Sequence, residues 1–200
     1  MTKIKMCGLT SSDDIAAVNE IRPEYIGFVF CSTSRRYVSE EKAQMLKSLL
    51  DDDIIAVGVF VDEDIERVAA LSNSGLIGAV QLHGNEDDEY ILRLKNMISA
   101  PVIKAFVISS PDDVRRAAES PADYVLLDSG SGSGRTFDWN IIGDLDREYF
   151  LAGGLDPLTA EDAVNRLHPY ACDVSSGIET SHVKDKNKMK AFADAVRKER

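Results

Sequence analysis

The chain has 200 residues, of which 44% are hydrophobic and 28% charged. This is enough apolar material for one sizeable core, and it favours a single domain over residues 1–200. Acidic residues outnumber basic ones by 34 to 23, which argues against a nucleic-acid partner. Three cysteines without a CxxC pair exclude a secreted disulfide framework. Without a signal peptide or a run of ~18 apolar residues, we expect a cytoplasmic protein with no membrane partner.

Short runs rich in β-branched and aromatic residues recur along the chain and alternate with amphipathic helical patterns. We predict strands over residues 3–7, 25–30, 54–61, 79–82, 102–106, 124–128, 149–152 and 171–174. Cap or acidic residues mark helix starts at 12–14, 39–41, 62–64, 85–87, 111–113, 159–162 and 184–186. The sixth connection differs. Its glycine- and serine-rich segment 129–136 predicts a loop, and only 137–143 could form a short helix, with Trp139 packed on the barrel.

The alternation of strands and helices predicts a mainly parallel sheet. Eight strands close a (β/α)₈ barrel, and 200 residues lie at the lower end of that fold's range. An open doubly wound sheet is the alternative. It usually carries a glycine-rich turn after its first strand, whereas Cys7-Gly8-Leu9-Thr10 has a single glycine. We therefore predict an α/β fold of the (β/α)₈ TIM barrel type.

Working residues of such a barrel lie at the C-terminal ends of the strands and in the loops that follow. Two glycine-containing stretches stand after the seventh and eighth strands. They contribute Gly153, Gly154, Ser175, Ser176 and Gly177. Each alone could be an ordinary turn. Together, at these two strands, their free amides and hydroxyls predict a phosphate site.

Cys7 and Asp128 end the first and sixth strands, so their side chains could face a substrate from different sides. A thiolate can remove a carbon-bound proton, and a carboxylic acid can deliver a proton to oxygen. The two residues are therefore candidates for an acid–base pair. The alternatives are a buried small apolar residue for Cys7 and a cap of the following glycine-rich loop for Asp128.

Arg36 is a candidate to bind a carboxylate with two hydrogen bonds, in competition with Arg35. His83 ends the fourth strand, where we expect a hydrogen-bonding role at the substrate site rather than a catalytic base. The three histidines are scattered without HxH or HExxH spacing, so no metal site is predicted.

A series of short motifs, in order along the chain, matches a known family. They cover residues 5–10, 27–30, 34–39, 57–61, 81–84, 127–129, 134–139, 151–155, 173–179 and 184–185. Together these motifs resemble the phosphoribosylanthranilate isomerase family of tryptophan biosynthesis, over nearly the whole chain. Each motif alone is weak, and their common order at the expected strand ends makes the resemblance specific.

The resemblance implies an Amadori rearrangement without a cofactor. An aldose–ketose isomerase of this kind converts a small-molecule substrate, N-(5-phosphoribosyl)anthranilate, to 1-(2-carboxyphenylamino)-1-deoxyribulose 5-phosphate. Asp128 would protonate the furanose ring oxygen, and Cys7 would remove the C2 proton of the resulting Schiff base. Arg36 would hold the anthranilate carboxylate, and the residues of the glycine-containing stretches would hold the phosphate. The chain could act as a monomer or a homodimer.

Three positions depart from the usual family pattern. Ser181-His182 stand where the family has proline and glycine, so we expect a different entry into the last helix. The Ser-Gly repeat at 129–134 replaces a Gly-Gly-Thr-Gly core and is expected to be more mobile. Cys31 replaces a frequent proline. None of these changes touches Cys7 or Asp128.

Two alternatives remain open from the sequence. A histidine-pathway or dual-substrate aminoaldose isomerase would handle two phosphates, but Val61-Asp62-Glu63-Asp64 after the third strand is acidic and would repel a second one. That histidine enzyme also has an aspartate at the position of Cys7. A non-catalytic metabolite-binding barrel is the other alternative, and the presence of both Cys7 and Asp128 counts against it.

Overall fold

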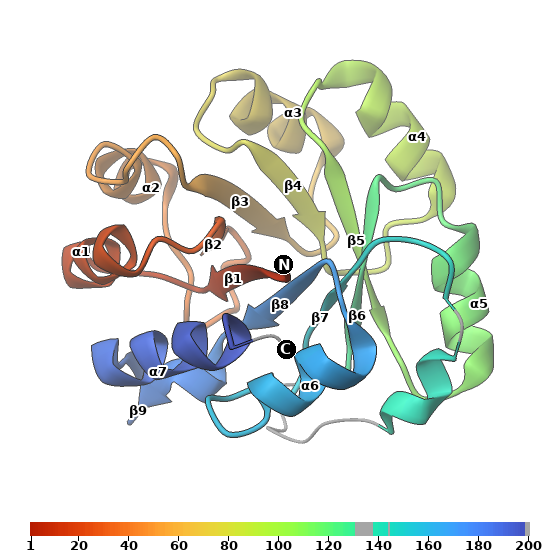
Figure 1. Ribbon diagram of the computed structural model, residues 1–200. Coiled ribbons are helices and arrows are strands. Elements are labelled where there is room, and N and C mark those ends of the chain that lie inside the picture. Colours follow the sequence, from red (N-terminus) through yellow and green to blue (C-terminus); the bar gives the residue numbers. More distant parts are fainter. Residues whose placement is uncertain (131–137, 144, 199–200) are drawn as a thin grey trace.

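The computed structural model describes residues 1–130, 138–143 and 145–198. Eight parallel strands form a closed barrel in chain order (Figure 1). They are β1 (Lys3–Cys7), β2 (Tyr25–Val29), β3 (Ile55–Phe60), β4 (Ala79–Leu82), β5 (Val102–Val107), β6 (Tyr124–Asp128), β7 (Tyr149–Leu151) and β8 (Ala171–Val174). The predicted (β/α)₈ barrel is confirmed, and the open doubly wound sheet is excluded. Predicted and observed strand ends differ by one residue at most.

Helices surround the barrel on its outside (Figure 1). They are α1 (Ser12–Ile21), α2 (Glu40–Lys47), α3 (Ile65–Asn73), α4 (Asp88–Met97), α5 (Pro111–Glu119), α6 (Ala160–Leu167) and α7 (Lys186–Val196). Side-chain caps define the starts of most of these helices, α6 being an exception. Before α1, for example, the Asp14 amide donates to the Ser11 hydroxyl while the Asp14 carboxylate accepts from the Ser11 amide. No helix of the described residues is long and apolar enough to cross a membrane.

The sixth connection carries the short 3₁₀ helix η1 (Trp139–Ile142). Trp139 is buried in the core, as predicted, and the guanidinium of Arg166 lies 5.4 Å from the centre of its ring. The expectation of a mobile Ser-Gly loop falls mainly on residues 131–137, which lie outside the described residues.

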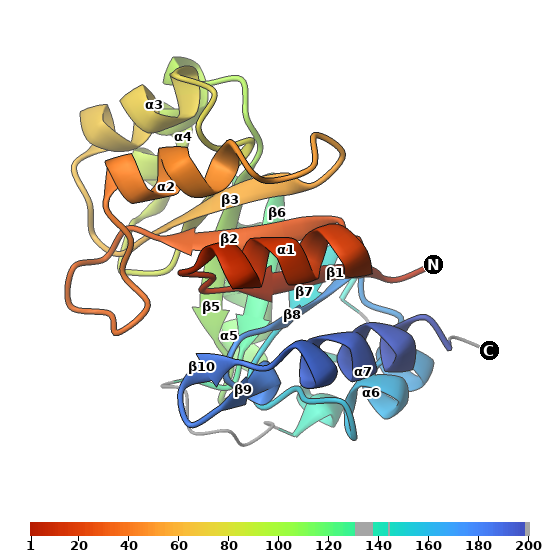
Figure 2. The same ribbon diagram turned by 90° about the vertical axis from the view of Figure 1, so that its left-hand side faces the viewer.

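The connection after β8 contains a small hairpin that the sequence did not predict. The 3₁₀ helix η2 (Ser176–Ile178) leads into β9 (Glu179–Thr180), which pairs antiparallel with β10 (Val183–Lys184) before α7 begins (Figure 2). Ser181 and His182 form the turn with φ of 50° and 68°, the positive pair that a type I′ turn requires. Because Glu179 and Lys184 are paired across the hairpin, the turn brings two opposite charges together.

Aromatic side chains fill the N-terminal end of the barrel. The Phe150 ring lies 5.5 Å from that of Tyr25 and 5.7 Å from that of Tyr124, between ring centres. Tyr170 stacks on Tyr124 at 4.7 Å, and its hydroxyl accepts a hydrogen bond from Lys3 at 2.6 Å. This packed floor leaves the C-terminal ends of the strands as the open end.

The ring of Phe150 is fully buried at the centre of this aromatic cluster. We expect Phe150→Ala to lower the free energy of unfolding by about 3–5 kcal/mol, through lost burial and an unfilled cavity. Leu158→Ala is the matched control because Leu158 is 89% exposed; it should change stability by less than about 0.5 kcal/mol. Urea denaturation measures both, and equal stability of the two variants would contradict this description of the barrel floor.

Candidate active site

A cavity of about 500 Å³ opens at the C-terminal ends of the strands. Every site residue predicted from the sequence lines it except Gly177. The lining predicted residues are Cys7, Arg36, His83, Asp128, Gly153, Gly154, Ser175 and Ser176. They come from loops and strand ends around most of the ring, although their positions in the sequence span 170 residues. The fold therefore gathers a thiol, a carboxyl, an imidazole, a guanidinium and a glycine-rich rim in one place.

Cys7 lies at the end of β1 and is 8% exposed, in contact with the apolar side chains of Val29 and Val59. A Cβ atom at Gly27 would come within 2.6 Å of its sulfur, so this glycine makes room for the thiol. Burial raises the pKa of Cys7, and the positive charges of Lys5 and Lys184 oppose that rise. The thiol is thus buried, and the charges of Lys5 and Lys184 favour its ionised form.

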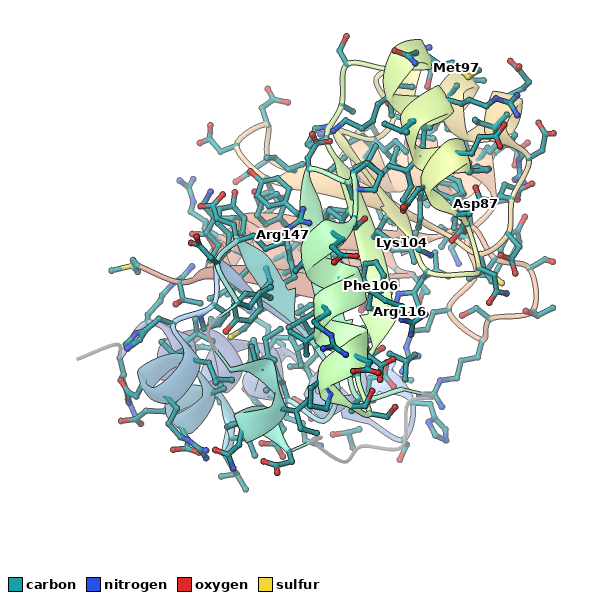
Figure 3. All side chains as sticks on the ribbon, turned by 90° about the vertical axis from the view of Figure 1, so that its right-hand side faces the viewer. Asp87, Met97, Lys104, Phe106, Arg116 and Arg147 are labelled. Atoms are coloured by element: carbon teal, nitrogen blue, oxygen red, sulfur yellow. The ribbon has the colours of Figure 1, made fainter. Side chains whose placement is uncertain are left out.

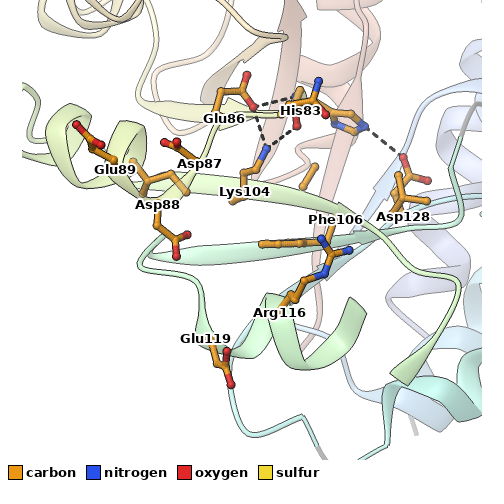
Figure 4. A pocket seen from close by; sticks show the side chains of 15 residues that line it. His83, Glu86, Asp87, Asp88, Glu89, Lys104, Phe106, Arg116, Glu119 and Asp128 are labelled. Carbon is orange, nitrogen blue, oxygen red and sulfur yellow. Dashed lines mark hydrogen bonds and ion pairs between the residues drawn. The ribbon is translucent and has the colours of Figure 1, made fainter. Parts of the chain in front are cut away.

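Asp128 ends β6 on another side of the cavity. Burial disfavours its ionised form, but hydrogen bonds from His83 and from the Gly130 amide outweigh burial and lower the pKa of Asp128. Nε2 of His83 lies 3.3 Å from Oδ2 of Asp128, and Figure 4 shows the imidazole turned toward this carboxylate. Nδ1 of His83 lies 2.8 Å from the side-chain amide nitrogen of Gln81. When that amide donates, the ring hydrogen is on Nε2 and faces Asp128.

Arg36 is held by a carboxylate of the protein itself. Its Nε and Nη2 donate to the two oxygens of Glu179 at 2.7 and 3.0 Å, the two-bond geometry typical of Arg–carboxylate pairs. Arg35 and Lys184 also donate to Glu179, at 3.0 and 2.9 Å. The Glu179 side chain is 5% exposed. Because these bonds use two of the five N–H donors of Arg36, the guanidinium has donors left to aim into the cavity.

The glycine-rich rim is formed by backbone that only small residues allow. Gly153 and Gly154 have φ of 85° and 69°, a conformation that glycine adopts without strain. Gly177 lies behind the rim, where a Cβ atom would collide with the carbonyl oxygen of Leu155. The Ser175 hydroxyl donates to the backbone carbonyl of Cys7 at 3.0 Å. This bond ties the rim to the strand that carries the thiol.

Some polar residues of the site were not predicted from the sequence. Lys5 is fully buried two residues before Cys7 and pairs with Asp173 on β8 at 2.9 Å. The sequence held one signal for Lys5: it stands two residues before Cys7 in a predicted strand, and alternate residues of a strand share a face. Glu179 and Lys184 belong to the unpredicted hairpin. In the described part of the chain, no group of three or more His, Cys, Asp or Glu side chains is placed to hold a metal ion.

A second cavity of about 700 Å³ adjoins the first and shares His83 and Asp128 with it. Figure 3 shows Lys104, Phe106 and Arg116 on this side of the barrel, near α5. The Lys104 ammonium donates to the carboxylate of Glu86 at 2.8 Å and to the carbonyl of Gly84 at 2.7 Å. Asp87, Asp88 and Glu89 also line this cavity. The charge of Lys104 is therefore balanced by Glu86, and the further acidic residues would repel a second phosphate.

The chain resembles known proteins over nearly its whole length. A sequence model of the family described as N-(5'phosphoribosyl)anthranilate (PRA) isomerase matches residues 4–195. The N-(5'-phosphoribosyl)anthranilate isomerase of Endomicrobium trichonymphae is 43% identical over 194 residues, which cover 94% of this chain and 95% of the relative. That of Lachnoclostridium phytofermentans is 41% identical, with 97% of each chain covered.

Solved structures agree with the sequence relatives. Phosphoribosyl anthranilate isomerase from Thermotoga maritima superposes with a TM-score of 0.91 at 35% identity, covering 99% of this chain and 100% of that one. A phosphoribosyl anthranilate isomerase in complex with reduced 1-(o-carboxyphenylamino)-1-deoxyribulose 5-phosphate gives a TM-score of 0.89 at 35% identity, with the same coverage.

The cluster around Glu179 should make stability depend on pH. Burial alone would raise the pKa of Glu179, but Arg36 and Lys184 outweigh burial and lower it from 4.5 to about 2. A depressed pKa in the folded state gives stabilisation that is complete above about pH 4.5 and is lost as the pH falls toward 2. The full difference corresponds to about 3 kcal/mol, of which about 2 kcal/mol is lost by pH 3.

We therefore expect the wild-type protein to lose about 2 kcal/mol more unfolding free energy than Glu179→Gln between pH 6 and pH 3. Urea denaturation at both pH values measures this difference. Glu66→Gln, at an exposed helix position, is the control and should follow the wild-type protein. Parallel pH profiles for wild type and Glu179→Gln would show that the carboxylate is not stabilised by its cations.

Proposed function

Because the chain belongs to the N-(5'-phosphoribosyl)anthranilate isomerase family, we propose that it converts N-(5-phosphoribosyl)anthranilate to 1-(2-carboxyphenylamino)-1-deoxyribulose 5-phosphate in tryptophan biosynthesis. One observation carries the assignment of roles. Cys7 and Asp128 line the same cavity from strands that are separated only by β7 and β8, with the glycine-rich rim between them. A substrate anchored on that rim would have a base on one side and an acid on the other.

The reaction uses the two residues in turn. Asp128 delivers a proton to the furanose ring oxygen while the C1–O bond breaks, and the nitrogen lone pair forms the Schiff base. The Cys7 thiolate then removes the C2 proton, and the electrons of the C–H bond move toward the nitrogen to give an enolamine. Tautomerisation of the enolamine gives the ketone. Substrate binding assists the first step because a more buried carboxyl favours its protonated form.

Binding groups at both ends would position the substrate for these steps. Arg36 is assigned to the anthranilate carboxylate, with Glu179 fixing the direction of its guanidinium. Gly153, Gly154, Ser175 and Ser176 are assigned to the phosphate, with Gly177 supporting this rim from behind. The solved relative in complex with reduced 1-(o-carboxyphenylamino)-1-deoxyribulose 5-phosphate supports a ligand with a carboxylate and a phosphate. Holding both ends converts binding energy into correct orientation of the reacting carbon.

The remaining assignments concern the state of the enzyme. An acid and a base suffice for this isomerisation, so we propose that it needs no cofactor and no metal. We also propose that residues 1–200 form one domain and that the enzyme acts in the cytoplasm as a monomer or homodimer. A solved structure of monomers generated from the dimeric phosphoribosylanthranilate isomerase of Thermotoga maritima, 33% identical to this chain, supports both states.

Turnover of N-(5-phosphoribosyl)anthranilate, followed by anthranilate fluorescence and coupled to the next enzyme, tests the function directly. We expect Cys7→Ala and Asp128→Asn each to lower kcat by at least about 100-fold, because each removes one proton-transfer group. Both variants should still bind the reduced product analogue. Cys31→Ala, which removes another thiol of the cavity, is the matched control and should keep normal turnover. A Cys7→Ala protein as active as this control would remove Cys7 from the mechanism.

Arg36→Met should weaken binding more than it slows ring opening. We expect KM to rise about 10- to 100-fold, since a charge-assisted hydrogen bond contributes about 1.5–3 kcal/mol, and kcat to change little. Steady-state kinetics separate the two parameters. Arg35→Met is the control, because Arg35 binds the same glutamate but is more exposed, at 47% against 22% for its neighbour. An unchanged KM for Arg36→Met with a raised KM for Arg35→Met would assign the carboxylate to Arg35.

A further inference from the structure

A buried ion pair lies next to the thiol of Cys7, inside the barrel. Lys5 and Cys7 are two residues apart on β1, so their side chains share one face of the strand. Nζ of Lys5 donates to Oδ1 of Asp173 at 2.9 Å, and these two residues are register partners on β1 and β8. The positive charge of Lys5 lowers the pKa of Cys7, against the rise that burial causes. Cys7 and Asp173 both line the cavity, with the ammonium of Lys5 buried on the same face of β1 as the thiol.

Stability does not explain this pair. The Lys5 side chain is completely buried and that of Asp173 is 9% exposed. Removing two charges from water costs several kcal/mol for each ion, and attraction between them repays this only in part. Apolar side chains fill similar inward-facing positions on other strands, among them Val57, Ile103 and Leu126. The charged pair is placed where its effect on a neighbouring group is largest, because the field of a buried charge is weakly screened.

The other charged groups around Cys7 are bound to partners of their own. Lys184 of β10 donates to Glu179 and to the Ser175 carbonyl, and Arg36 forms its two bonds with Glu179. On the far side of the cavity, His83 and Asp128 pair with each other. The neutral thiol of Cys31 is 3.2 Å from the hydroxyl of Thr33. Lys5 differs from these cations because it lies on β1 itself, two residues before Cys7 and on the same face of the strand.

We propose that Lys5 is a positioning residue that stabilises Cys7 as a thiolate, and that Asp173 moderates the charge of Lys5. The proposal rests on the role of Cys7 as the base, assigned above. A base works best when its proton affinity matches the operating pH. Burial raises the pKa of Cys7, Lys5 and Lys184 oppose that rise, and Asp173 adds to it. The two members of the ion pair thus act on the thiol in opposite directions.

Two single substitutions with opposite expected signs test the proposal. Lys5→Met removes the cation, so ionisation of Cys7 should move to higher pH. Asp173→Asn removes the opposing anion, so ionisation of Cys7 should move to lower pH. The readout is the pH dependence of iodoacetamide alkylation at Cys7, in a Cys31→Ala background with the modified site identified by mass spectrometry. We expect each midpoint to move by about one pH unit, a tenfold change in thiolate population below the midpoint. The acidic limb of the kcat–pH profile should move in the same direction.

A double variant controls for folding. Lys5→Met alone leaves the Asp173 carboxylate buried without its cation, which is strongly destabilising. Lys5→Met/Asp173→Asn removes both charges and should fold, with a midpoint between those of the single variants. If Lys5 and Asp173 only supported the structure, the variants would lose stability and kcat while the alkylation midpoint stayed at its wild-type value.

The outcomes separate this proposal from the proposed function. Midpoints that do not move, or that move in the same direction in both single variants, overturn the role of Lys5 and Asp173 but leave Cys7 as the base. Alkylation midpoints that move as expected while the kcat profile does not move overturn the proposal through its premise, because the thiolate would then not be the catalytic base. The Cys7→Ala turnover test decides that premise independently.

Discussion

The pairing of β1 with β8 is the constraint on which the site depends. It joins segments from the two ends of the chain, with Lys3 through Met6 in register with Ala171 through Val174. The same closure places the Ser175 hydroxyl on the carbonyl of Cys7, so the thiol and the glycine-rich rim have a fixed relation. Outside the barrel, α7 packs beside α1 (Figure 2) and closes the layer of helices at the same place. Without this closure, the base and the rim would belong to unconnected ends of the molecule.

Glu179 is the second point at which distant segments meet. Its buried carboxylate receives Arg35 and Arg36 from the segment after β2 and Lys184 from the hairpin after β8. A carboxylate with several charge-assisted partners is costly to protonate or to move. Arg36, which is assigned to the anthranilate end of the substrate, is therefore bound to the hairpin that follows the glycine-rich rim. In the proposed assignment, both ends of the substrate would be bound by one connected unit.

Local patterns in the sequence predicted much of this structure, and long-range pairs account for what they missed. Strand runs ended within one residue of the observed strands because β-branched and aromatic clusters mark them directly. The position of Cys7 and Asp128 at one cavity was predictable because the barrel places the C-terminal strand ends at its open end. The hairpin around Ser181-His182 was missed since its strands have two residues each and its positive φ values fall on residues other than glycine. Asp173, the partner of Lys5, lies 168 residues away in the sequence. Periodicity shows which residues of one strand share a face, so it could not identify a partner on another strand.

The two sides of the cavity have different electrostatic surroundings, a lysine near the base and an imidazole that lowers the pKa of the acid. Cys7 must lose a proton to act as the base, and the positive charge of Lys5 favours that loss. Asp128 must hold a proton to act as the acid, so a lysine in contact with it would be harmful. Lys104 is the lysine that lines a cavity with Asp128, and Figure 4 shows it turned toward Glu86 while His83 faces Asp128. Glu86 and the Gly84 carbonyl bind its ammonium, so the acid keeps an imidazole as its partner.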